Sequence, residues 1–250
     1  MNNQDLEQAY NKIEVRMRRL AKRKGEIYVP NIVPHGSVDY IFICMEPSLG
    51  EWARNCDEAE SRLKAGFRNF LDGYNTMILH YAIRNYLCRD NQRYHITDLS
   101  KGAMLVRDAD ADRTARYKRW YPLLLEEIDL VASANARVFA VGTHVAGFLK
   151  SREFPWEATL LIHYSGNAVS HWNRVVQEHE EDFKLFQSTV TQEDFLDNAK
   201  DVIKSSRVPY VIGERALGRL HKGNLTISRL KLMFNYKLIF NAVHDFNRNQ

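Results

Sequence analysis

The stretch Val38-Asp-Tyr-Ile-Phe-Ile-Cys-Met-Glu-Pro-Ser-Leu-Gly50 decides the fold. Its first half is apolar, β-branched and aromatic, and it ends abruptly in an acidic residue, a proline and a glycine, which is the pattern of a buried strand followed by a turn. Open parallel α/β sheets bind their ligands beyond the carboxyl ends of the strands. We therefore expect Glu46 to lie at the edge of a sheet where chemistry takes place.

Three further segments have the pattern of strands, and helical segments separate them. This alternation predicts an α/β fold in which a four-stranded parallel sheet is sandwiched by helices. Two intervening stretches are charged, and we expect a loop with a short helix over 51–73 and an exposed connection over 108–119. The predicted strands are 38–44, 93–98, 137–142 and 158–163, and the predicted helices between and after them are 74–87, 121–132, 143–150 and 169–186.

Helices are also predicted at both ends of the chain. Residues 5–24 have apolar positions at helical spacing and a basic opposite face, and Gly25 is a natural stop. Beyond Thr189, Thr191 and Asp194 form a capping-box pattern that opens a helix to residue 205, and a second apolar helix is expected over 226–243. We predict an α/β domain over 1–189 and a helical extension over 190–250.

Composition narrows the class of protein. The chain has 250 residues, 45% of them hydrophobic, which is enough for a proper core. Its three cysteines, Cys44, Cys56 and Cys88, form no Cys-x-x-Cys pair, so we expect no disulfide framework, zinc site or iron–sulfur cluster. No targeting pattern and no stretch of about 18 apolar residues is present, and we expect a cytoplasmic protein. The net charge of +4 is a mild bias towards polyanions, although a solvated basic face explains it equally well.

Polar residues follow three of the predicted strands. Glu46, Asp98 and His163 each lie at or just past the carboxyl end of a different strand, so we expect them to converge on one cleft. Two carboxylates and a histidine are an acid–base set. Taken singly, each has a plain alternative, because a strand-end Asp often caps a turn and a single His is often structural.

These residues resemble the uracil-DNA glycosylase superfamily. Cys44-Met-Glu-Pro-Ser48 is similar to the first motif of its single-strand-selective branch, Gly-Met-Asn-Pro-Gly, with Glu46 in place of the catalytic Asn. His163-Tyr-Ser-Gly-Asn-Ala168 resembles the second motif, His-Pro-Ser, with Tyr164 in place of Pro. The base-reading Asn of the family falls on Asp98. The resemblance covers roughly residues 38–186.

The resemblance implies hydrolysis of an N-glycosidic bond in DNA after the target nucleotide has been flipped out of the stack. Glu46 would orient or deprotonate the attacking water, and His163 would donate to the base carbonyl. Lys101 is interpreted as a phosphate contact or surface residue rather than a nucleophile, so we expect a monofunctional enzyme. The other residues implied are Met45, Phe67 and Phe70 at the base, with Phe67 and Phe70 alternatively packed in the core, and Ser48, Ser165, Gly166 and Asn167 at the DNA.

Asp98 is the departure that bears on the substrate. An ionised carboxylate only accepts hydrogen bonds, which suits the N4 amino group of cytosine and not the 4-carbonyl of uracil. Ordinary cytosine would be a destructive substrate, so we expect a modification at the 5-position. Anti-phage members of the superfamily that attack glucosylated hydroxymethylcytosine in viral DNA resemble this interpretation.

Three alternatives remain open on the sequence. One is a conventional uracil glycosylase in which Asp98 is protonated or contacts the base through water. Another is a non-catalytic DNA-binding module, and the third is a free-nucleotide enzyme, although no glycine-rich phosphate loop follows any predicted strand. We expect a monomer whose partner is DNA, with no metal, no cofactor and no membrane contact.

Overall fold

The computed structural model describes residues 3–49, 52–105, 111–165 and 168–248. The chain divides into two compact units. The first comprises Met1–Asn69 and Gln92–Leu160, and the second comprises Phe70–Asn91 and Leu161–Gln250. This division differs from the predicted one at residue 190, because residues 70–91 and 161–189 group with the C-terminal helices.

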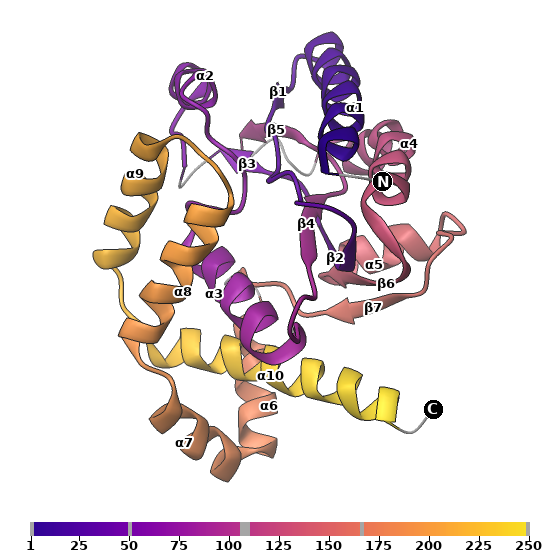
Figure 1. Ribbon diagram of the computed structural model, residues 1–250. Helices are drawn as coiled ribbons and strands as arrows, with labels where there is room; N and C mark the ends of the chain where they lie inside the picture. Colours follow the sequence, from indigo (N-terminus) through magenta and orange to yellow (C-terminus); the bar gives the residue numbers. More distant parts are fainter. Residues whose placement is uncertain (1–2, 50–51, 106–110, 166–167, 249–250) are drawn as a thin grey trace. The chain divides into compact units, whose positions relative to one another are not determined.

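A four-stranded parallel sheet organises the first unit (Figure 1). Its strands lie in the order β4-β2-β6-β7, and the central strand β2 pairs in parallel with both β4 and β6. The predicted α/β class, with a four-stranded parallel sheet flanked by helices, is confirmed. The strand bounds are β2 Val38–Cys44, β4 Tyr94–Asp98, β6 Ala132–Val141 and β7 Ala158–Leu161.

The register of β2 and β4 brings Glu46 and Asp98 to the same sheet edge. Cys44 is the partner of Asp98 at the carboxyl ends of the two strands. Pairing continues past the strands, because the Leu99 amide donates to the Cys44 carbonyl at 2.9 Å and the Ser100 amide donates to the Met45 carbonyl at 3.1 Å. The segments that follow β2 and β4 therefore remain hydrogen-bonded to each other beyond the strand ends.

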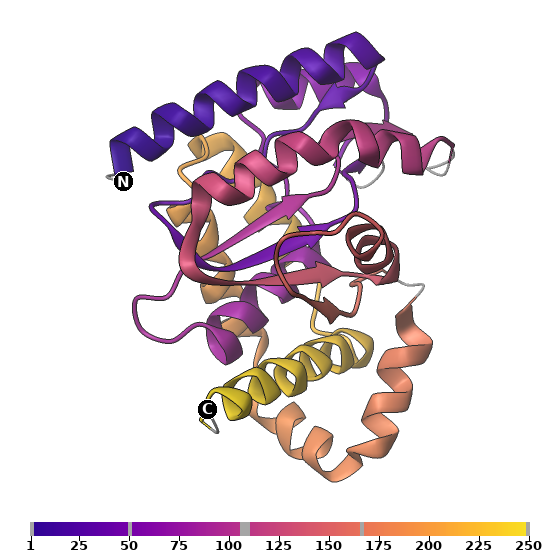
Figure 2. The same cartoon turned by 90° about the vertical axis from the view of Figure 1, so that its right-hand side faces the viewer.

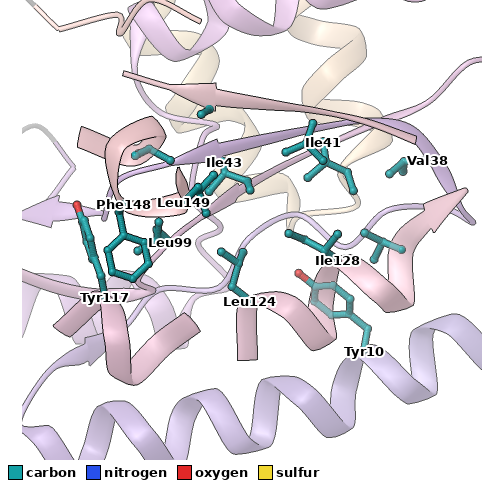
Figure 3. Close-up of a cluster of buried hydrophobic side chains, with 14 of the residues drawn as sticks. Tyr10, Val38, Ile41, Ile43, Leu99, Tyr117, Leu124, Ile128, Phe148 and Leu149 are labelled. Carbon is teal, nitrogen blue, oxygen red and sulfur yellow. The ribbon is translucent and has the colours of Figure 1, made fainter. Parts of the chain in front are cut away.

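The main core lies on the face of the sheet covered by α4, α5 and the N-terminal helix α1 (Figures 2 and 3). Side chains alternate between the two faces of a strand, so Ile41 and Ile43 point together towards Leu124 and Ile128 of α4. Burying each such side chain contributes about 1.5–3 kcal/mol. The helices are α1 Asn3–Lys24, α4 Arg113–Val131 and α5 Thr143–Lys150.

Aromatic side chains line the opposite face of the same strands. The rings of Phe42 and Phe139 are stacked with centroids 4.8 Å apart, and Tyr94 meets Phe42 edge-on. Asp98 follows Tyr94 and Ile96 in the alternation of β4, so its side chain belongs to this face, whereas His95 and Thr97 belong to the face covered by α4.

A smaller sheet that the sequence did not predict completes the first unit. Its order is β1-β5-β3, with β1 Ile27–Tyr28 antiparallel to β5 Gly102–Leu105 and β3 Ser48–Leu49 parallel to β5. Strands of two residues are too short to show a hydrophobic period. The short helix expected within 51–73 is α2, Cys56–Lys64, and Asn55 caps it by accepting from the Glu58 amide at 2.9 Å.

The prediction of an exposed connection over 108–119 is wrong for its described part. Helix α4 begins at Arg113, and Arg116, Tyr117 and Trp120 are 1–2% exposed. The alternating acidic and basic residues are typical of a solvent-exposed segment, but Arg116 is buried and pairs with Glu46. Residues 106–110 lie outside the described residues.

The second unit is helical. Residues 74–87 form α3, Tyr74–Ala82, which continues as a π-helical turn, η1, Ile83–Leu87. The helix predicted over 169–186 is two helices that meet at His179, and the capping box of Thr191 and Asp194 is confirmed. Helix α9 was not predicted. The remaining bounds are α6 Val169–Glu178, α7 Glu180–Thr189, α8 Gln192–Ser205, α9 Tyr210–His221 and α10 Ile227–Arg248.

Helix α10 lies against several segments of the second unit. Phe234 on α10 contacts Phe183 and Phe186 of α7, with ring centroids 5.4 Å apart in both pairs. The Tyr236 hydroxyl donates to the Ile162 carbonyl at 3.1 Å. None of the helices in the described ranges combines the length and the apolar character that crossing a bilayer requires.

Candidate active site

Glu46 lies two residues beyond β2, and the first turns of α4 hold its carboxylate. Arg113 places Nη2 at 3.1 Å and Nε at 3.2 Å from Oε1, and Arg116 places Nη2 at 3.4 Å from the same oxygen. The Tyr117 hydroxyl donates to Oε2. The Glu46 side chain is only 4% exposed. Both carboxylate oxygens are therefore held in place by groups of one helix.

Tyr117 acts as a neutral donor in this cluster. Burial raises the pKa of the Tyr117 hydroxyl, and the adjacent charge of Glu46 raises it further. The hydroxyl consequently stays protonated at neutral pH. Tyr117 also lies at one end of the main core and packs edge-on against Phe148, which fixes the ring (Figure 3).

Asp98 is the last residue of β4 and is 2% exposed. Its Oδ2 accepts a hydrogen bond of 2.8 Å from the side-chain amide of Asn69. Burial raises the pKa of Asp98 to about 7, and the charges of Glu46 and Glu127 also raise it, although Lys101 and Asn69 oppose the rise. Near neutral pH this carboxyl group is thus present in both protonation states.

Glu46 and Asp98 form one electrostatic system. They follow neighbouring parallel strands in register, and the charge of Glu46 contributes to the raised pKa of Asp98. The structure therefore brings together two of the three predicted strand-end residues. The two carboxyl groups differ in surroundings, because Glu46 has two cationic partners whereas Asp98 is held by a neutral amide.

His163 belongs to the second unit, two residues beyond the end of β7. The Ser165 amide donates to its Nδ1 at 3.0 Å, so Nδ1 is an acceptor and the proton of the neutral ring is assigned to Nε2. The ring of Tyr164 stacks on the imidazole with centroids 4.5 Å apart. Tyr164 thus supports the imidazole from one side. That His163 shares a site with Glu46 and Asp98 stays a prediction.

The three residues predicted to line the base are all wholly or partly buried. Met45 packs against the main core. Phe67 is 2% exposed, with Trp52 stacked 4.7 Å away and the Arg62 guanidinium 5.0 Å from its ring centroid. This arrangement favours packing over base stacking for Phe67. Phe70 is buried in the second unit and has a positive φ of 68°.

The prediction that Lys101 is a phosphate contact or surface residue is wrong. Its side chain is 2% exposed, and Nζ lies 2.7 Å from Oε2 of Glu127. It also donates to the Thr97 hydroxyl and, at 3.3 Å, to the Asp98 carbonyl. The partner lies in α4, and nothing in the local sequence of Lys101 signals it.

Glu127 is the centre of this buried polar cluster. Its Oε1 accepts from Tyr10 at 2.5 Å and lies 3.0 Å from Nε2 of His95, and its Oε2 accepts from Thr97 at 2.9 Å. Burial alone would raise the pKa of Glu127, but Lys101 and His95 hold it well below its usual range. The cluster ties β4, the strand that carries Asp98, to α1 and α4.

Asn69 is the site residue that sequence reasoning missed. It follows no predicted strand, and it lies in the long segment over 51–73 in which only the aromatic residues drew attention. Its backbone amide donates to the Pro30 carbonyl at 2.8 Å, which fixes the residue beside the sheet edge. No local pattern of the sequence signals its contact with Asp98.

The residues predicted to contact DNA are only partly described. Ser48 is in β3, and its side chain lies outside the described residues. The Ser165 amide donates to Nδ1 of His163, and the Ser165 carbonyl accepts from the Ala168 amide at 3.0 Å. Gly166 and Asn167 lie outside the described residues. These DNA contacts stay predictions.

Comparison of the chain with protein-family models and with curated proteins gave no match. In the described parts of the chain, no three His, Cys, Asp or Glu side chains are grouped so that they could hold a metal ion. Chemically, the first unit offers an oriented carboxylate, Glu46, beside a carboxyl group, Asp98, that donates or accepts according to pH. The second unit offers an imidazole with its N–H assigned to Nε2.

Proposed function

We propose that the chain is a DNA glycosylase that hydrolyses the N-glycosidic bond of a flipped-out modified pyrimidine, most simply a 5-modified cytosine such as glucosylated hydroxymethylcytosine in phage DNA. The product is an abasic site. The observation that carries the proposal is the pair of strand-end carboxyl groups, Glu46 and Asp98, in contrasting surroundings at one sheet edge. Separate roles for two carboxyl groups are a recurrent arrangement in hydrolysis of glycosidic bonds.

Glu46 acts on the sugar side of the bond. As the base departs, the sugar gains oxocarbenium character, so a fixed negative charge and an oriented water lower the barrier. Each carboxylate oxygen has about two acceptor positions, and the Tyr117 hydroxyl takes one of those on Oε2, so the water is placed at the other. Arg113 and Arg116 offset part of the charge of Glu46, so orienting the water is its main task, and its remaining charge stabilises the developing oxocarbenium ion.

His163 acts on the leaving base. Negative charge builds on the base carbonyl as the bond breaks, and a neutral imidazole with its proton on Nε2 donates a hydrogen bond there without first having to gain a second proton. The hydrogen bond from Ser165 to Nδ1 supports this role because it fixes the tautomer. The proposal requires His163 to reach the same nucleotide as Glu46.

Asp98 reads the Watson–Crick edge of the base. In its ionised form it accepts from the N4 amino group of a cytosine-type base. The alternative is a conventional uracil glycosylase, and one observation favours it: with a pKa of about 7, Asp98 is partly protonated at neutral pH and then donates to the uracil 4-carbonyl.

Incubation with defined DNA tests the proposal. Oligonucleotides that carry uracil, hydroxymethylcytosine or glucosylated hydroxymethylcytosine are incubated with the protein, and abasic sites are scored by alkaline cleavage. The expected result is abasic product from the modified-cytosine DNA. Product from uracil alone would support the conventional enzyme, and DNA binding without abasic product from any base would leave a non-catalytic DNA-binding module.

A further inference from the structure

Asn69 and Asp98 form a hydrogen-bonded pair at the sheet edge. The Asn69 amide donates to Oδ2 of Asp98 at 2.8 Å, and within the described ranges no hydrogen bond involves Oδ1. A carboxyl oxygen that already accepts from an amide is the poorer place for a proton, because a proton there would face the N–H. When Asp98 is protonated, the proton is therefore on Oδ1.

We infer that Asn69 is a positioning residue that sets the base specificity of the site: it holds Oδ2 of Asp98 and leaves Oδ1 to meet the 4-substituent of the base. Ionised, Oδ1 accepts from the 4-amino group of cytosine-type bases. Protonated, it donates to the 4-carbonyl of uracil-type bases. The inference rests on the proposed glycosylase function and deepens it, because it assigns two substrate classes to one site and lets pH select between them.

The segment that carries Asn69 is anchored to the rest of the first unit. The Asn69 backbone amide donates to the Pro30 carbonyl at 2.8 Å, and the adjacent Arg68 donates to the Asn31 carbonyl at 2.9 Å. Arg68 also pairs with Glu14 of α1 at 2.6 Å. The side-chain amide of Asn69 is thus presented to Asp98 from a fixed backbone.

Charged groups from each neighbouring segment act on Asp98. Lys101, in the turn after β4, favours its ionised form, whereas Glu46 after β2 and Glu127 on α4 favour its protonated form. Burial also favours the protonated form, and the hydrogen bond from Asn69 favours the ionised form. Loss of the Asn69 amide therefore moves the titration of Asp98 to higher pH.

The first measurement needs no substrate. Protein labelled with ¹³C at the aspartate carboxyl carbons is titrated by NMR, and Asp98→Asn assigns the signal. The midpoint of wild-type Asp98 is expected near pH 7, and Asn69→Ala is expected to raise it by about one pH unit. Ser61→Ala, an exposed change on α2, is the matched control and should leave the midpoint unchanged. An unchanged midpoint in Asn69→Ala overturns the inference.

The second measurement is the ratio of uracil release to modified-cytosine release as a function of pH. Titrations that affect the release of both bases equally cancel in this ratio. Uracil release needs protonated Asp98 and modified-cytosine release needs the ionised form, so the ratio follows the ratio of the two forms and is expected to fall by up to about tenfold per pH unit on both sides of the midpoint. In Asn69→Ala the ratio should be up to about tenfold higher than in the wild type at each pH.

The outcomes separate the two claims. If wild-type protein releases neither base, the proposed function fails, and the specificity inference fails with it. If it releases bases at a ratio that does not change with pH, only the inference is overturned. The wild-type ratio requires no variant, so the test remains decisive even if Asn69→Ala fails to fold.

Discussion

Arg113 places its guanidinium 3.1 Å from Oε1 of Glu46, across a separation of 67 residues in the sequence. This contact joins the first turn of α4 to the end of β2. Together with Arg116 and Tyr117 it gives the carboxylate one orientation, which is the form of pre-organisation that a water-orienting group requires.

Glu46→Gln should abolish base release and leave DNA affinity almost unchanged. The amide keeps the size of the side chain but removes the negative charge, so we expect a loss of about 10²–10⁴-fold in single-turnover rate. The rate is measured as abasic product, and affinity by fluorescence anisotropy with the same oligonucleotide. Unchanged turnover would remove Glu46 from the catalytic assignment.

Tyr117→Phe should reduce base release by about tenfold, since the phenylalanine keeps the packing on Phe148 but no longer donates to Glu46. Tyr121→Phe is the matched control on the same helix, because its hydroxyl donates to the Arg152 carbonyl, at 3.5 Å. Its rate should stay within about twofold of wild type. Equal rates in the two variants would show that the orientation of Glu46 does not limit the reaction.

His163→Ala should lose base release with little change in affinity, because the imidazole stabilises charge that develops only as the bond breaks; a loss of about 10²–10³-fold is expected. The matched control is His171→Ala, an exposed histidine of α6 that contacts Arg174. A leaving group that needs no donor bypasses the defect, so an activated synthetic base should be released at nearly the wild-type rate. Equal losses for natural and activated bases would argue against the donor role.

Lys101→Met should destabilise the protein by about 3–5 kcal/mol, since it leaves Glu127 charged and buried without its cation. Urea unfolding monitored by circular dichroism gives the free energy of unfolding. The control Lys118→Met changes an exposed lysine of α4 and should cost less than about 0.5 kcal/mol. The double change Lys101→Met with Glu127→Gln should recover part of the loss. A Lys101→Met protein as stable as wild type would contradict the buried ion pair.

Asp98→Asn should stabilise the protein at neutral and alkaline pH. Burial raises the folded-state pKa of Asp98 to about 7 from a usual value of 3.8, so the folded state holds a proton that the unfolded state has released. Stability therefore falls as pH rises from about 4 to 7, by at most about 4 kcal/mol. Asp98→Asn should remove that fall, as measured by thermal unfolding across this range. The depressed pKa of Glu127 acts in the opposite sense, and its contribution is lost progressively as the pH falls below the usual value of 4.5.

The sheet was predictable because its signals are local. The bounds of β2 agree with the predicted residues 38–44, and Thr191 and Asp194 form the capping box that their spacing predicts. Glu46 and Asp98 were found because each ends an apolar run, and strand ends of a parallel sheet share an edge.

The remaining features depend on partners far away in the sequence. The first turns of α4 appeared exposed because Arg116 is charged, yet its partner Glu46 lies 70 residues earlier. Lys101 was assigned to the surface for the same reason, since Glu127 cannot be inferred from its neighbours. Asn69 lies in a segment that is neither helix nor strand, so no hydrophobic periodicity indicates which of its side chains point inward.

The burial of the Glu127 cluster also determines how the protein should respond to salt. Dissolved ions screen charges at the surface over roughly 10 Å at 0.1 M ionic strength, but they do not enter a site whose charged side chains are 0–2% exposed. High-salt washes during purification should therefore remove any nucleic acid that is bound through surface charges. The buried cluster should keep its ion pairs under the same conditions, so the position of β4, which carries Asp98, should not change.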